Sequence, residues 1–208
     1  MNRRRKLNDC LMMSKIHGHI ELCRVRLEEV EEARERAIRL SRGLLKLARK
    51  AVSLAHRGEP KEAQKIAKEG LKTYCEFMSG LSETTRSVCL SALAPSVQEL
   101  VEATVLSQLL IGNEISGPDE LGVGCREYLL GLADAALELR RAALDALRRN
   151  APERAERLVE IMESLMDSLS ILVFPDAILP IRHKVDTLRS LIDRTRSDII
   201  ASAGREIR

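Results

Sequence analysis

Aromatic residues are almost absent from this 208-residue sequence: it has no Trp, and Phe, Tyr and Trp together make up 2% of the chain. OB folds and RRMs hold single strands by stacking bases on aromatic side chains. So few aromatic residues argue against that kind of binding surface.

Cysteine pairs are also lacking. The five cysteines are widely spaced, and none forms a Cys-x-x-Cys motif. An odd, scattered set argues against both a disulfide framework and a zinc ribbon. The basic residues 1–6 are followed by a stretch too polar for a signal peptide, so we expect reduced thiols in a cytoplasmic protein.

Long apolar runs and strand patterns are missing as well. The longest apolar stretches, such as 104–112, are interrupted by Ser and Gln and fall short of the roughly 20 residues that a membrane span needs. We therefore expect no membrane partner. No stretch alternates apolar and polar residues for long enough to predict a strand, which excludes Rossmann and P-loop phosphate sites.

What the sequence does contain is helical periodicity. Apolar residues recur at spacings of three and four, and Pro60, Pro95, Pro152 and Pro180 each precede a periodic segment, as prolines at helix starts do. The pattern predicts an all-α single domain. The expected helices cover 20–57, 60–79, 83–92, 95–111, 126–149, 152–172 and 180–201, with a glycine-rich loop at 112–124 and a break at 174–176.

Charge is unevenly distributed. Residues 1–60 carry 15 Lys and Arg against 8 Asp and Glu, a net charge of +7, and the remainder of the chain is mildly acidic. Within the first predicted helix, basic residues at helical spacing form one stripe that could follow nucleic-acid phosphates. A solvated face opposite Leu40, Leu44 and Leu47 is the alternative. The stripe consists of Arg39, Arg42, Lys46 and Arg49.

Two apolar helices carry acidic pairs. Glu99 and Glu102 are three residues apart, Asp134 and Glu138 are four apart, and each pair lies on one helix face. If the two helices pack antiparallel across the glycine-rich loop, the four carboxylates could converge. Hard oxygen ligands of this kind suit Mg²⁺ or Mn²⁺. The alternative is an ordinary exposed face on which Glu138 pairs with Arg141.

These same helices resemble the translin family, and within it translin-associated factor X and its archaeal relatives. The resemblance rests on Val97-Gln-Glu-Leu-Val-Glu-Ala103 and Tyr128-Leu-Leu-Gly-Leu-Ala-Asp-Ala-Ala-Leu-Glu-Leu-Arg140, with support from the Phe174 break and the closing helix from Arg182 to Asp198. It implies a translin-like domain over 20–208, preceded by a basic segment, 1–19, that is helical or flexible. It also implies a bundle of about seven helices that assembles into a hollow homo-oligomer, typically an octamer.

The resemblance further implies Mg²⁺-dependent RNA cleavage by an acidic cluster at Glu99, Glu102, Asp134 and Glu138, which would be both catalytic and metal-binding. Translin proper carries an Arg/His-rich nucleic-acid-binding segment before the first acidic helix, whereas residues 88–94 here are almost wholly apolar. The expected partners are RNA, with single-stranded DNA as a further candidate, and other copies of the chain.

Three functions follow from these observations. The first is an Mg²⁺-dependent endoribonuclease that cleaves single-stranded or short duplex RNA inside a homo-oligomeric shell. The second is a shell that binds RNA or single-stranded DNA without cleaving it, through the basic N-terminal part of the chain. The third is a helical interaction module that involves no nucleic acid.

Overall fold

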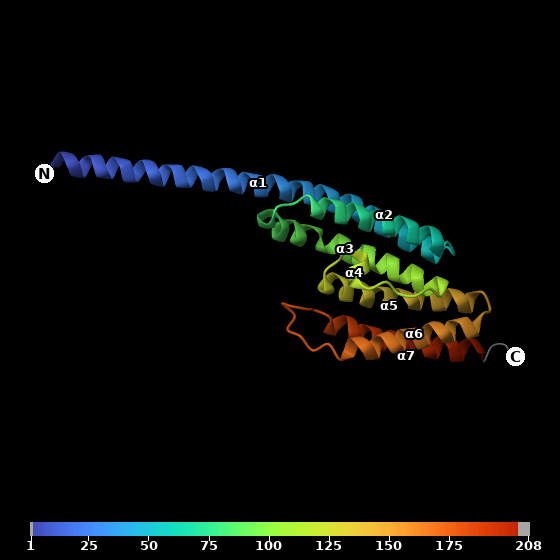
Figure 1. Cartoon of the computed structure of the whole chain (residues 1–208). Helices are drawn as coiled ribbons and strands as arrows, with labels where there is room; N and C mark the ends of the chain where they lie inside the picture. The colour runs from blue at the N-terminus through green and yellow to red at the C-terminus, as the bar shows by residue number, and fades with distance from the viewer. Residues whose placement is uncertain (1, 204–208) are drawn as a thin grey trace.

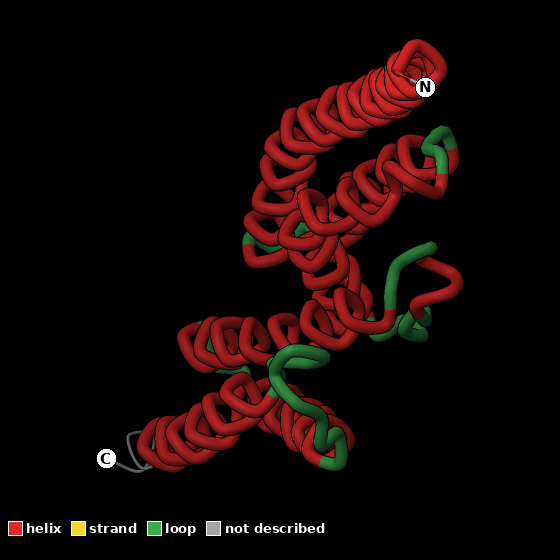
Figure 2. Tube along the Cα trace, turned by 90° about the vertical axis from the view of Figure 1, so that its left-hand side faces the viewer, coloured by secondary structure: helices red, strands yellow, loops and turns green. Residues whose placement is uncertain are grey.

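The computed structural model describes residues 2–203, with side chains from Met12 to Ser202, and this part of the chain contains helices and loops but no strand. The predicted all-α architecture is confirmed. Figure 1 shows α5 lying between a layer of α1, α2 and α3 and a layer of α6 and α7, and Figure 2 shows the same arrangement from the side. The helices are α1 (Asn2–His56), α2 (Pro60–Ser79), α3 (Glu83–Ile111), α4 (Pro118–Leu121), α5 (Cys125–Arg148), α6 (Pro152–Ser170) and α7 (Arg182–Ala203).

Helix α1 is longer than predicted, because it begins at Asn2 and passes through residue 20 without a break. Its C-terminal half packs against α2 and α3. The buried face is mostly alanine, and such small side chains let helices approach closely. These residues are Ala33, Ala37, Leu44, Ala48, Ala51 and Ala55.

The N-terminal part of α1 projects beyond the bundle (Figure 1). Every side chain from Met12 to Glu29 is exposed, and Val30 is half-buried. We refer to residues 12–30 as the arm. Apart from Val30, the arm therefore gains little stability from packing within its own subunit.

Helix α3 contradicts the prediction of two helices, 83–92 and 95–111, because it runs unbroken through Pro95. A proline inside a helix leaves the carbonyl four residues earlier without its partner. That residue is Ser91, which is exposed, so water can reach it, and Pro95 is exposed too. The flanking residues Leu93 and Val97 are buried, so tertiary packing holds the helix together on both sides of the proline. Pro60 and Pro152 do begin α2 and α6, and Pro180 lies two residues before α7.

Helices α3 and α5 run in the same direction, so the antiparallel arrangement assumed from the sequence is wrong. Gln98 of α3 contacts Asp134 of α5, and further along both helices Leu110 and Ala146 lie at one pocket. Residues 112–124, including the short helix α4, lead the chain back, and Cys75 of α2 lies against Leu121 within this segment. At about 3.3 Å per extended residue the segment easily spans the roughly 20 Å from one end of this contact to the other.

Gly131 permits close contact between α3 and α5. A Cβ atom at this position would lie 2.6 Å from the Gln98 carbonyl oxygen and 2.8 Å from Val101 Cβ. Real Cβ atoms do not approach backbone oxygen so closely, so the two helices can come this near only because residue 131 is glycine. It brings the acidic turns of the two helices together.

By length and hydropathy α3 is also the one helix among the described residues that could span a membrane. Half of its most apolar segment is buried, and it packs among α1, α2 and α5. The apolar composition of α3 is therefore explained by its place in the core of the bundle.

Candidate active site

Three of the four predicted acids line one pocket. Glu99 and Glu102 come from α3 and Asp134 from α5, around an open cavity of about 440 Å³. Arg49 of α1 and Arg141 of α5 line the same cavity. The pocket thus combines carboxylates of α3 and α5 with one cation from α1 and one from α5, and that combination can hold a charged ligand.

Glu102 is the most perturbed of these acids. Its pKa is raised to about 8, chiefly by burial and also by the nearby charges of Asp134, Glu138 and Glu99, against an opposing effect of Lys184. The Glu102 carboxyl is therefore mostly protonated at neutral pH. A cation bound in the pocket would reverse this balance, because it would stabilise the ionised form.

Asp134 is held by two donors from different helices. The Lys184 ammonium on α7 forms an ion pair with Asp134 Oδ1, and the Gln98 amide on α3 donates to Asp134 Oδ2 over 2.6 Å. Both donors fix the orientation of the carboxylate. Lys184 lies 50 residues further along the chain, so the cation that pairs with Asp134 comes from a distant part of the sequence.

Glu138 lies one helical turn further along α5, does not line this pocket, and is hydrogen-bonded to His56. The buried His56 ring, with 3% of its surface exposed, donates from Nε2 to Glu138 Oε2 over 2.6 Å. This hydrogen bond is the largest cause of a lowered Glu138 pKa, which the charge of Arg141 lowers further. His56 Nδ1 is buried without a hydrogen-bond partner. His56 is isolated in the sequence, 82 residues from Glu138, so spacing gave no signal of the pair.

The basic stripe leads to the acids. Arg39, Arg42, Lys46 and Arg49 are all exposed along α1. Arg39 forms an ion pair with Glu35 over 3.3 Å, and Arg49 reaches Glu99 with 3.4 Å between Nε and Oε2. The expected stripe thus exists as a solvated face, and its last member also lines the acidic pocket. A nucleic-acid backbone that followed this stripe along α1 would bring a phosphate to the carboxylates at Arg49.

The donor chemistry of the pocket suits a hard divalent cation, but the carboxylates do not form a closed ligand cluster. Among the described side chains, no three His, Cys, Asp or Glu residues lie close enough to hold a metal together. Three of the acids are paired with other groups: Glu99 with Arg49, Asp134 with Lys184 and Glu138 with His56. Among the described side chains, Glu102 alone of the four has no ion-pair partner. The buried Glu102 carboxyl with its raised pKa fits a site that a cation completes.

Comparison with known proteins gives consistent results. The model of the Translin family matches residues 32–196. An uncharacterised protein of Methanocaldococcus jannaschii is 29% identical over 185 residues, which cover 84% of this chain and 78% of the relative.

Three solved structures are also similar. The crystal structure of AfC3PO has a TM-score of 0.82 and 32% identity, covering 91% of this chain and all of the other. AfC3PO in complex with duplex RNA has a TM-score of 0.76 and 34% identity, covering 91% of this chain and 98% of the other. Apo-NeC3PO has a TM-score of 0.75 and 25% identity, covering 88% of this chain and 96% of the other.

Proposed function

The chain belongs to the Translin family, and on this premise we propose that it is an RNA-binding protein and a divalent-metal-dependent endoribonuclease that works as a homo-oligomer, an octamer by family resemblance. The observation that carries the proposal is the pocket in which Glu99, Glu102 and Asp134 meet at the end of the basic stripe. A similar solved structure holds duplex RNA, which supports RNA as the ligand.

Each group around the pocket has a role in this proposal. Glu99, Glu102 and Asp134 would hold Mg²⁺ or Mn²⁺, and Glu138 would complete the ligand set or orient the attacking water. The chemistry supplied by such a cation is polarisation of a phosphodiester oxygen and a lower pKa for the attacking water.

The surrounding side chains position the acids and the RNA. Lys184 and Gln98 fix the Asp134 carboxylate, and His56 fixes Glu138. Exposed cations of the basic stripe bind backbone phosphates, and Arg49 places a phosphate beside the carboxylates. A phosphate at Arg49 would compete with Glu99 for the guanidinium and free this acid for the cation.

The test is a cleavage assay with end-labelled RNA in the presence of Mg²⁺ or EDTA. We expect cleavage with Mg²⁺ and none with EDTA. Asp134→Asn should abolish cleavage and leave RNA binding equal or tighter, because the substitution removes a ligand charge and a source of phosphate repulsion. Undiminished Mg²⁺-dependent cleavage by the Asp134→Asn protein would exclude this site as the catalytic centre.

The second candidate is a shell that binds RNA or single-stranded DNA without cleaving it. One observation favours it: Arg49, Lys184 and His56 already occupy three of the four acids. This candidate predicts binding that weakens steeply with salt and does not require Mg²⁺. Lys46→Glu should weaken binding and flatten the salt dependence, and RNA that stays intact in Mg²⁺ would favour this candidate over the nuclease.

A further inference from the structure

The arm carries an apolar stripe with the spacing of a coiled coil. Its positions are separated by 3, 4, 3, 4 and 3 residues, which corresponds to alternating a and d positions of a heptad repeat. Apart from its half-buried last residue, Val30, the stripe is open to solvent: Ile20 is 61% exposed and Leu27 is 67% exposed. It consists of Met13, Ile16, Ile20, Cys23, Leu27 and Val30.

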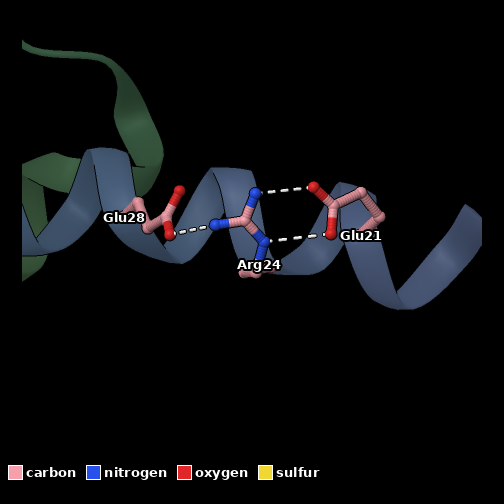
Figure 3. Close-up of polar contacts among 3 residues, drawn as sticks. All are labelled: Glu21, Arg24 and Glu28. Atoms are coloured by element: carbon pink, nitrogen blue, oxygen red, sulfur yellow. Dashed lines mark hydrogen bonds and ion pairs between the residues drawn. The ribbon is translucent and has the colours of Figure 1, made fainter.

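The arm is also built to stay helical without support from the bundle. Figure 3 shows Arg24 between Glu21 and Glu28, with ion pairs to both. Ion pairs between residues three or four apart stabilise an isolated helix. Arg24 also lowers the pKa of Glu21. These pairs lie beside the apolar stripe and neutralise the Arg24 charge within its own helix.

An exposed apolar stripe on a stable helix needs a partner. A repeat of 3.5 residues keeps the stripe in continuous contact only with another helix that supercoils around it, and this favours a helix with the same repeat. We propose that the arm pairs with the arm of a second copy of this chain as a parallel, in-register coiled coil over residues 13–30. The proposal builds on the homo-oligomer proposed above and adds the surface and orientation of one of its contacts.

The charges beside the stripe set the orientation. In a parallel pair, a g position of one helix lies beside the e position of the following heptad on the other. Arg26 occupies g and Glu31 occupies e, so both copies of this opposite-charge contact form. In the antiparallel register that aligns the same apolar layers, Arg26 lies instead near His19 of the second copy, and Glu31 loses its cation.

The parallel register also places equivalent residues in each layer. Cys23 occupies a d position, so the two Cys23 thiols face each other across the core of the coiled coil. In the antiparallel register, Cys23 faces Ile20 of the second copy. Disulfide formation at Cys23 therefore reports both the pairing and its direction, because a bridge needs Cα atoms about 5–6 Å apart.

The experiment uses the full-length chain with Cys10→Ser and Cys125→Ser, so that Cys23 is the exposed thiol among the side chains that the structure describes. The protein is oxidised with copper phenanthroline and analysed on non-reducing gels, with mass spectrometry of the linked peptide. We expect a Cys23–Cys23 disulfide. The matched control carries Cys23→Ser and Val25→Cys, which move the thiol to the outer face of the arm. Its yield of disulfide-linked dimer should be about tenfold lower, because in the paired arms the two introduced thiols at position 25 point away from each other and their effective concentration is low.

Two substitutions test whether the stripe drives the pairing. Leu27→Asp, in the stripe, should abolish the Cys23 disulfide, whereas Leu22→Asp, also exposed but off the stripe, should leave it unchanged. Circular dichroism checks that both variants stay helical. No Cys23 disulfide, or a disulfide that forms only after Ile20→Cys supplies a thiol opposite Cys23, overturns the parallel pairing. If the arm does not pair while the protein remains an RNA-binding oligomer by light scattering, only this inference fails and the proposed function stands.

Discussion

Replacing Glu102 by Gln should stabilise the protein at neutral pH and leave its stability unchanged in acid. The wild-type carboxyl has a pKa of about 8 in the folded protein and an ordinary value of 4.5 in the unfolded chain. Between these two values the unfolded state loses a proton that the folded state keeps, so stability falls as pH rises. The glutamine is neutral at every pH and avoids this loss.

The size of the effect follows from the two pKa values. At pH 7 the unfolded carboxyl is about 2.5 pH units above its pKa, and each unit corresponds to about 1.4 kcal/mol, so the penalty is at most about 3 kcal/mol. At pH 4 the penalty is close to zero, because the group is largely protonated in both states. Glu102→Gln should therefore gain up to about 3 kcal/mol at pH 7 relative to pH 4.

Urea denaturation followed by helical circular dichroism measures this difference, at one protein concentration, in EDTA, and at pH 4, 5.5 and 7. The control is Glu114→Gln, an exposed acid in the loop after α3, which should show no pH-dependent gain. Mg²⁺ should stabilise the wild type at pH 7 more than the Glu102→Gln protein, because the variant lacks a ligand. Equal effects of Glu102→Gln at pH 4 and pH 7 would mean that Glu102 is ionised in the folded protein, which would refute the reasoning.

Three further substitutions probe the pairing and packing around the site. His56→Leu should cost about 1–3 kcal/mol, because it removes the donor to Glu138, and the loss measured by urea denaturation should be largest above the ordinary carboxyl pKa and shrink as pH falls through the lowered one. Gly131→Ala should cost about 1–3 kcal/mol in the same assay, since its Cβ would meet the Gln98 carbonyl. Pro95→Ala should raise the urea midpoint, because the exposed proline removes one helix hydrogen bond and alanine restores it; a lower midpoint would contradict this account of Pro95.

The sequence was sufficient to predict the fold class and the acids. Helical spacing identified the elements, and the prolines at 60 and 152 marked two helix starts. The acidic pairs stood out because Glu99, Glu102 and Asp134 interrupt strongly apolar helices, and the structure places these three at one pocket. Periodicity is a local property, so it predicts which face a residue occupies on its own helix.

The partners of the acids could not be predicted, because they depend on which helices become neighbours. Lys184 and His56 approach Asp134 and Glu138 from α7 and α1, at separations of 50 and 82 residues. The direction of α5 relative to α3 was also missed, since the assumption that consecutive helices pack antiparallel holds best for short connections. The prediction that a helix ends before Pro95 was wrong for a related reason. Burial of the residues on both sides of the exposed proline outweighed its propensity to end a helix.

Helix α1 connects the three features on which the proposals depend. Its arm carries the heptad stripe, its middle carries the exposed cations, and its last two turns supply Arg49 and His56 to the acids. Because its alanine face lies against α3, the basic stripe and the carboxylates of α3 form one rigid unit. Pairing of two arms would then fix the relative orientation of two pockets and two basic stripes, and an RNA that follows one stripe would be directed relative to the other. Arm pairing and RNA cleavage can be separated by the Leu27→Asp protein: a loss of RNA affinity with an intact acidic pocket would assign the arm to RNA capture, and unchanged affinity would confine it to assembly.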